Sequence, residues 1–137
     1  MAYFLAKTDP ETYSIQDLKK DGETVWDGVH NYQAINVIKS WQPGDQVFVY
    51  HSQGQSKIVG LMEVVGEPYK DPHDKRGISW VAKVRFVKEF EPEKQVSLAD
   101  VKAEDSLKDF LLVRHSRLST MACPDSFIDW LKSKKVL

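Results

Sequence analysis

The sequence predicts an α+β domain built as a small, partly closed β-barrel with short helices packed against its openings. Short strand-like and helix-like segments alternate along the chain, which is typical of this class. Two strand-like runs near the middle, 46–51 and 58–66, are joined by a short turn at 53–55, as in a hairpin. Long regular βαβ units are absent, which argues against a doubly wound nucleotide-binding sheet.

The first half of the chain contains clear start and stop signals. Ser14 is followed three residues later by Asp17, which predicts a helix start, and Asp21-Gly22 ends that helix. Asn31 is a plausible N-cap for the next helix. In order, we expect a strand at 3–7, a helix from Ser14 to about Lys20, an extended Val25-Trp26, a helix over 32–41, strands over 46–51 and 58–66, a loop over 67–77, and a long strand over 79–90.

The second half changes in texture after Pro92. Ser97 with Asp100 repeats the helix-start pattern, and a further helical turn is expected over 106–110. A strand is expected over 118–121. The last helix should open near 124–126, because the apolar residues that follow it have helical spacing. No linker, repeat or low-complexity run interrupts the chain, so residues 1–137 are expected to form one domain.

Composition excludes several classes of protein. The chain has 137 residues, a formal net charge of -1 and one cysteine, Cys123, so neither an internal disulfide nor a Cys-rich zinc site is expected. No apolar stretch approaches the ~18 residues that span a membrane, and the N-terminus does not resemble a signal peptide. We therefore expect no membrane partner and a cytoplasmic location, or a nuclear one in a eukaryote.

Charge is unevenly distributed although the total is near zero. Residues 70–90 and 107–137 each contain six Lys/Arg against three Asp/Glu, whereas residues 1–30 contain three against six. The basic segments either fold into one positive face or form ordinary solvated surface. Near-neutrality argues against a polycation that coats nucleic acid.

Motifs for catalysis are missing from the sequence. The four histidines are not spaced as metal ligands, and no Gly-x-Ser-x-Gly, GxxxxGK[ST] or GxGxxG pattern occurs. Cys123 precedes Pro124 at the start of the last helix, where a helix dipole lowers a thiol pKa, but a packing role is the simpler interpretation. We therefore expect no metal, no cofactor and no catalytic residue.

Aromatic and polar residues gather instead at the ends of elements. Trp26, Asn31 and Tyr32 surround a glycine turn, His51-Ser52 ends a strand, and Arg117-Leu118-Ser119 precedes another. Aromatic faces with hydrogen-bonding neighbours suit a flat heterocycle such as a nucleobase. The alternative is that the aromatics are core residues and Asn31 only caps a helix.

At these segments the chain resembles the EVE-domain family of the PUA-like superfamily. The resemblance is carried, in the family's order, by Tyr3-Phe4-Leu5-Ala6-Lys7-Thr8-Asp9-Pro10, Tyr13-Ser14-Ile15-Gln16-Asp17-Leu18, Thr24-Val25-Trp26-Asp27-Gly28-Val29-His30-Asn31-Tyr32-Gln33-Ala34, Pro43-Gly44-Asp45, Phe48-Val49-Tyr50-His51-Ser52, Ile58-Val59-Gly60, Val96-Ser97-Leu98 and Arg117-Leu118-Ser119. It covers nearly the whole chain. It implies a PUA-like fold, a small curved β-barrel flanked by short helices.

The resemblance also implies a pocket for a modified nucleobase in DNA or RNA. Carried over by position, the pocket residues are Lys7, Thr8, Trp26, Asn31, Tyr32, His51, Ser52, Arg117, Leu118 and Ser119, with Trp26 as an aromatic wall. The chain departs from the family at His30, where Arg is usual, at Lys7-Thr8-Asp9-Pro10 instead of Lys-Ser-Glu-Pro, and in a short loop over 67–80.

The resulting expectation is a non-enzymatic module that binds nucleic acid carrying modified bases. Stacking at ~1–3 kcal/mol per base and hydrogen bonds to the base edge offset the cost of extruding the base. Two alternatives use the same pocket: a nucleic-acid-processing enzyme such as an ASCH-like nuclease, and a sensor of a free nucleoside. The sequence leaves the oligomeric state open.

Overall fold

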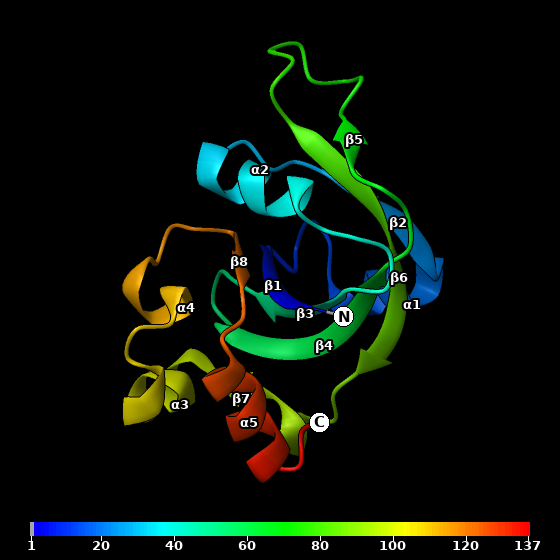
Figure 1. Cartoon of the computed structure of the whole chain (residues 1–137). Coiled ribbons are helices and arrows are strands. Elements are labelled where there is room, and N and C mark those ends of the chain that lie inside the picture. Colours follow the sequence, from blue (N-terminus) through cyan, green and yellow to red (C-terminus); the bar gives the residue numbers. More distant parts are fainter. Residues whose placement is uncertain (1) are drawn as a thin grey trace.

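The computed structural model describes residues 2–137 and is organised around a strongly curved mixed sheet (Figure 1). Its strands are β1 (Tyr3–Thr8), β2 (Glu23–Trp26), β3 (Gln46–His51), β4 (Lys57–Val64), β5 (Tyr69–Lys70), β6 (Trp80–Glu89), β7 (Val96–Ser97) and β8 (Thr120–Ala122). The helices are α1 (Ile15–Asp21), α2 (Tyr32–Lys39), α3 (Leu98–Ala103), α4 (Leu111–Arg114) and α5 (Asp125–Ser133), with 3-10 turns at Pro92–Lys94 and Asp105–Leu107. The α+β prediction is confirmed.

In the sheet, β1 and β3 are neighbours, and their C-terminal ends lie side by side. The main path runs β2-β6-β4-β3-β1-β8, with β5 added beside β6 and β7 beside β4. The hairpin expected in the middle of the chain is β3–β4, and β1 runs parallel to β3 with Thr8 opposite His51. Lys7 and Thr8 therefore lie at the same end of the sheet as the β3–β4 turn.

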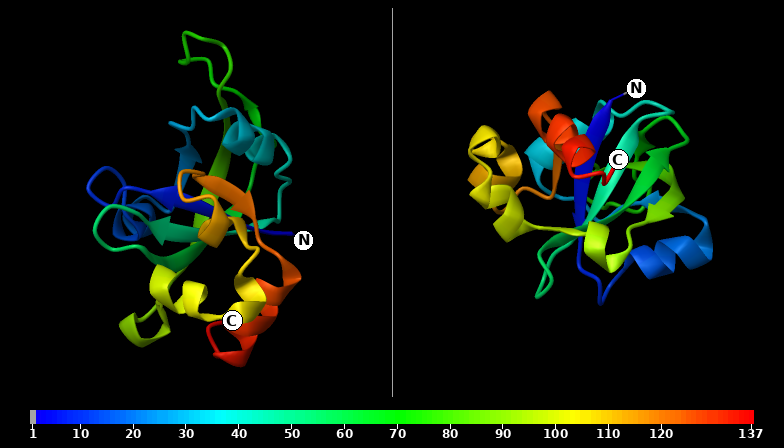
Figure 2. Two further views of the ribbon diagram at one scale, coloured as in Figure 1. Left: turned by 90° about the vertical axis from the view of Figure 1, so that its left-hand side faces the viewer. Right: turned by 90° about the horizontal axis from the view of Figure 1, so that it is seen from below.

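The barrel remains open along one seam. Within residues 2–137, β2 and β8 are the two ends of the main path and share no ladder. Helix α2 packs against both β6 and β8, so it bridges part of the seam, and Figures 1 and 2 show it lying across this side of the sheet. The fold is therefore a curved sheet plugged by a helix rather than a closed barrel.

The helix-start signals in the sequence correspond to real caps. Ser14 and Asp17 form a reciprocal capping box at α1, and Ser97 with Asp100 does the same at α3. The Asn31 side chain accepts a hydrogen bond from the backbone N–H of Ala34 at 3.1 Å. These caps satisfy backbone donors that a helix leaves unpaired in its first turn.

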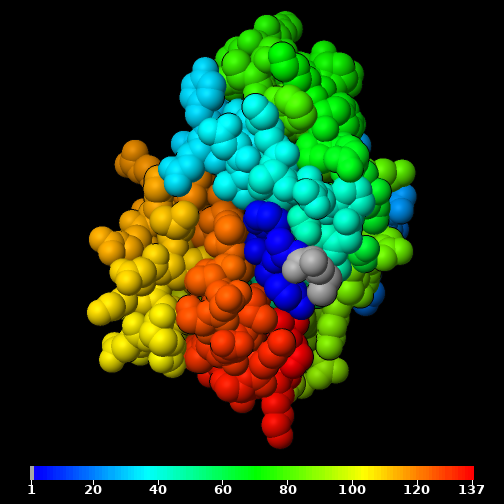
Figure 3. All heavy atoms as spheres, viewed as in Figure 1, coloured from blue at the N-terminus to red at the C-terminus, as the bar shows by residue number. Residues whose placement is uncertain are grey.

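Helix α5 covers the sheet through aromatic contacts. Phe127 packs edge-to-face on Phe48 of β3 at 5.6 Å between ring centroids, and Phe110 lies 4.8 Å from Phe127. Figure 3 shows the start of β1 emerging between α2 and α5. The apolar stripe expected in the last helix is thus its core-facing side.

Several predicted boundaries were wrong. The helix expected over 32–41 ends at Lys39, because Pro43 disfavours helical backbone just before it and Ser40 caps the helix. The loop expected over 67–77 contains β5, which is held only by pairing with β6. The strand expected over 118–121 begins at Thr120 and ends at Ala122, where it pairs with β1.

Residues 2–137 contain no membrane-spanning helix and no cluster of metal ligands. None of the helices there has the length and apolar character required to cross a membrane. No three His, Cys, Asp or Glu side chains come together as metal ligands in that range.

Candidate functional site

A cavity of about 370 Å³ lies at the seam, between the end of β1 and the edge strand β2. Its walls come from β1, the loop before α1, β2 with the turn after it, and the residue before β8. The lining residues are Lys7, Thr8, Asp9, Thr12, Tyr13, Thr24, Val25, Trp26, Asp27, Gly28, Val29 and Ser119. The place where the sheet does not close therefore holds a concave site.

The end of β1 is held in place by hydrogen bonds to two loops. The backbone N–H of Lys7 donates to the carbonyl of Ser119 at 2.7 Å, and the Thr8 hydroxyl donates to the carbonyl of Tyr13 at 2.7 Å. The Lys7 Nζ donates to the carbonyl of Ser116 at 3.0 Å, and burial lowers the pKa of this ammonium. Lys7 thus lines the cavity, while its ammonium is directed to the carbonyl of Ser116.

Two aromatic side chains form the back of the cavity. Trp26 is 6% exposed and meets the ring of Tyr13 edge-on, at 6.4 Å and 79°. The Tyr13 hydroxyl donates to Asp21 Oδ2 at 2.8 Å, and burial together with that carboxylate raises the pKa of Tyr13 to about 12. The phenol therefore stays neutral near pH 7, and Trp26 proves to be both a core aromatic and a cavity wall.

The remaining lining supplies hydrogen-bonding groups of both kinds. Thr24 precedes Trp26 by two residues on β2, so the two side chains share one face of the strand. Asp27 accepts no hydrogen bond from another residue of the described chain, whereas Asp9 Oδ1 accepts from the Glu11 N–H at 3.0 Å. Gly28 turns the chain with φ +77°, a conformation that disfavours other residues.

Four of the residues predicted for the pocket line this cavity: Lys7, Thr8, Trp26 and Ser119. His51 lies elsewhere, buried at 2% exposure, with Nε2 accepting from the Ile15 N–H at 3.0 Å and Nδ1 facing Gln55 Oε1 at 2.9 Å. Leu118 is fully buried in the core. Both side chains have structural contacts that account for their positions.

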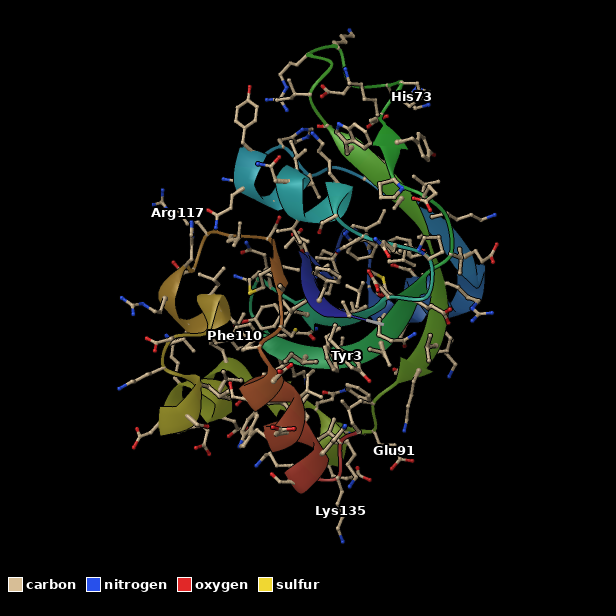
Figure 4. The ribbon with its side chains drawn as sticks, viewed as in Figure 1. Tyr3, His73, Glu91, Phe110, Arg117 and Lys135 are labelled. Carbon is tan, nitrogen blue, oxygen red and sulfur yellow. The ribbon has the colours of Figure 1, made fainter. Side chains whose placement is uncertain are left out.

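The other predicted residues lie around the cavity rather than in it. Asn31 is engaged as the α2 cap, and Tyr32 beside it is 69% exposed. Ser52 donates to the Thr8 carbonyl at 3.2 Å. Figure 4 shows Arg117 projecting outward from the segment between α4 and β8. Tyr32 and Arg117 are thus free to contact a large ligand at the surface.

Tyr13, Thr24 and Asp27 line the cavity although sequence reasoning did not select them. The period-two alternation of a strand places Thr24 on the same face as Trp26, so the sequence alone was sufficient to predict Thr24 as a neighbour of Trp26. Tyr13 gave no such signal, because its position depends on how the loop before α1 folds back onto β2.

A hydrogen-bonded cluster adjoins the cavity at His30. Ser79 donates to the Val29 carbonyl at 2.9 Å and lies 3.2 Å from His30 Nδ1. Arg76 Nη2 is 2.8 Å from the same nitrogen. Because arginine has only donors, His30 Nδ1 is the acceptor in that contact. The loop between β5 and β6 thus places a guanidinium next to the cavity turn.

Asp74 organises this loop, which predicts a pH dependence. Its carboxylate accepts from the N–H groups of Arg76, Ile78 and Ser79, and these bonds hold its pKa well below the ordinary value. A depressed carboxyl pKa contributes stability that is present above the unfolded-state pKa and lost as pH falls through the folded-state pKa. We expect amide exchange protection at Ser79 to persist from pH 7 to 4 and to fall only in stronger acid, and Asp74→Asn to lose it at pH 7. Protection lost already at pH 5, or kept in Asp74→Asn, contradicts this role.

Cys123 has the character of a packing residue. It packs against the hydrophobic core, and burial raises the pKa of its thiol, opposite to what a nucleophile requires. It lies outside the cavity lining.

Comparison with known proteins decides the family. The family model described as "EVE domain" matches residues 2–133. The chain belongs to the EVE-domain family. Chicken thymocyte nuclear protein 1 is 32% identical to it over an alignment that covers 96% of this chain and 67% of the chicken protein.

Solved structures agree with the EVE fold. The structure of human THYN1 in complex with DNA containing 5-methylcytosine is 29% identical, with a TM-score of 0.86, and the match covers 97% of this chain and 96% of that one. A protein from Agrobacterium tumefaciens is 30% identical, with a TM-score of 0.87, over 97% of this chain and 92% of that one. The PUA-like prediction is confirmed.

One of the structural matches is much more distant in sequence. A mutant ASCH protein from Zymomonas mobilis shares the fold at a TM-score of 0.63, but only 9% of its sequence is identical, so it shows a common fold alone. Among the EVE-domain relatives, human THYN1 was solved as a complex with DNA, so a binding role is what this comparison supports.

Proposed function

We propose that this EVE domain binds nucleic acid and holds a single modified nucleobase in the cavity at the seam. The observation that carries the proposal is the cavity itself, a concave site of about 370 Å³ with an indole wall and both donors and acceptors. It lies in a chain whose relative, human THYN1, was solved in complex with 5-methylcytosine DNA.

The lining chemistry suits a methylated pyrimidine. Val29 and the Trp26 indole provide apolar surface for a methyl group and a flat ring. Asp27 offers an acceptor to an exocyclic amine, as carboxylates do for cytosine N4. The hydroxyls of Thr8 and Ser119 offer donors or acceptors to the rest of the edge.

The surroundings suit a strand that continues past the extruded base. Tyr32 is an exposed aromatic on which a neighbouring base can stack. Arg117 projects outward (Figure 4) and precedes the cavity residue Ser119 by two positions, and Arg76 contacts His30, which follows the cavity residue Val29. Cations on either side of the cavity serve to contact phosphates.

The test is a binding panel at two salt concentrations. The wild-type protein is titrated with matched DNA and RNA oligonucleotides carrying cytosine or 5-methylcytosine, and with the corresponding free nucleosides. We expect tighter binding to one modified strand than to its unmodified match, with affinity falling as salt rises. Equal affinity for modified and unmodified strands overturns the proposal. Tight nucleoside binding without any strand binding favours the sensor alternative, and strand cleavage with Mg²⁺ or Mn²⁺ favours the nuclease.

A further inference from the structure

A second cavity, of about 200 Å³, lies beside the first. It is bounded by the end of β3, the turn after it, α3, and the segment around α4. Its lining residues are Lys7, Tyr50, Ser52, Ser56, Leu98, Lys102, Leu112, Val113 and Ser116. Lys7 lines both cavities.

Lys7 forms hydrogen bonds on the side of each cavity. Lys7 donates from its backbone to the Ser119 carbonyl at 2.7 Å, on the side of the first cavity, and from Nζ to the Ser116 carbonyl at 3.0 Å, in the second. The neighbouring Thr8 carbonyl accepts from the Ser52 N–H at 2.9 Å. Lys7 and its backbone neighbours thus belong to the walls of both cavities.

The charge of the second cavity differs from that of the first. It is lined by two lysines and by no carboxylate, whereas Asp9 and Asp27 line the first. Within residues 2–137, neither Lys7 nor Lys102 forms a salt bridge. An ammonium has three donors, and Lys7 uses one of them on the Ser116 carbonyl.

Hydroxyl groups add further donors to this cavity. Ser56 and Tyr50 contribute hydroxyls, and burial raises the pKa of the Tyr50 phenol. The Ser52 hydroxyl also lines this cavity, but it already donates to the Thr8 carbonyl. The Lys7 Nζ also lies 5.6 Å from the centre of the Tyr50 ring. Ammonium and hydroxyl donors without carboxylates suit an anion such as phosphate better than an uncharged nucleobase.

We propose that the second cavity binds the phosphate attached to the nucleoside whose base occupies the first, with Lys7 between base and phosphate and Lys102 on the outer side. This inference rests on the proposed function and deepens it, because it makes the nucleotide, rather than the base, the unit that is recognised. The ligand chemistry is a phosphate ester, which either a free nucleotide or a nucleic-acid backbone provides.

The test compares 5-methyl-2′-deoxycytidine with its 3′- and 5′-monophosphates. We expect one monophosphate to bind at least about tenfold more tightly than the nucleoside, since charge-assisted hydrogen bonds reach this size. Lys102→Glu should remove that advantage and leave nucleoside affinity unchanged. Lys132→Glu is the matched control, because it makes the same charge change at an exposed lysine of α5 outside both cavities.

Oligonucleotides separate this inference from the proposed function. For a single strand, Lys102→Glu should reduce the slope of log affinity against log salt by about 0.7, the value for one lost phosphate contact, without changing the preference for the modified base. A wild-type protein that prefers the modified base but gains nothing from the phosphate overturns the inference alone. The inference is also overturned if inorganic phosphate displaces the monophosphate as effectively as an unlabelled monophosphate does, because the site would then not recognise a nucleotide. Failure to bind any of the base-containing ligands overturns the proposed function first.

Discussion

Trp26→Leu is expected to weaken binding of a 5-methylcytosine oligonucleotide by roughly 5- to 150-fold, which corresponds to the ~1–3 kcal/mol of stacking on one base. Leucine keeps apolar bulk at a site that is 6% exposed but removes the flat indole face that lines the cavity. Fluorescence anisotropy with the modified and unmodified strands measures the loss. The preference between the two strands should shrink along with the affinity.

Trp41→Leu provides the matched control. Trp41 is a second buried indole, 1% exposed, which lines none of the described cavities. Its N–H has no hydrogen-bond partner within residues 2–137, so the substitution breaks no bond of that group. Both variants should lose stability through poorer packing, while only Trp26→Leu should lose binding. Equal affinity losses in the two variants would show that stability, not stacking, causes the effect.

Gly60→Ala is expected to destabilise the fold by about 3 kcal/mol or more, at the upper end of overpacking effects. A Cβ at Gly60 would lie 2.6 Å from Ile15 Cδ1 and 2.6 Å from the backbone carbonyl of Lys88. The side chain can rotate, but the carbonyl belongs to β6 and cannot move without disturbing the sheet. Urea unfolding measures the difference in the free energy of unfolding.

Gly66→Ala is the control for Gly60→Ala. A Cβ there meets only Lys83 Cβ at 3.5 Å, an ordinary contact, so stability should change by less than about 1 kcal/mol. Ile15 Cγ1 also lies 2.8 Å from the added Cβ, so Ile15→Val removes only one of three clashing atoms and should restore little of the loss. Wild-type stability of Gly60→Ala would contradict the steric explanation.

Gly60 also affects the site at a distance. Ile15 begins α1, and its N–H donates to the buried His51 Nε2. Close approach of Ile15 to β4 therefore fixes where α1 begins, and with it the preceding Tyr13 that forms part of the cavity wall. The shape of the cavity is therefore expected to depend on a strand glycine that is not among its lining residues.

Local signals in the sequence predicted local structure well. The capping boxes at Ser14 and Ser97 and the hairpin around residue 54 involve residues close in the chain, so their chemistry is visible in a short window. Strands β5 and β7 have two residues each and exist because β6 and β4 pair with them. Such pairing across the sheet leaves no periodicity to detect.

The site was only partly predictable, for the same physical reason. Resemblance pointed to Trp26, Lys7, Thr8 and Ser119, which do share one cavity. The same resemblance also pointed to His51, but this side chain accepts a hydrogen bond from the N–H of Ile15, a residue 36 positions away. A polar residue at a strand end looks the same in sequence whether it meets a ligand or a buried backbone group.

The position of α2 affects the width of the cavity. Because β2 and β8 share no ladder within residues 2–137, no row of backbone hydrogen bonds dictates their separation. Side-chain packing of α2 on β6 and β8 sets that spacing instead. Substitutions of buried α2 residues such as Ala34 or Ile38 can therefore widen or narrow the cavity while every lining residue stays the same. A fold of this kind can diverge in which base it accepts through its supporting helix, so proteins with identical pocket residues need not share a ligand.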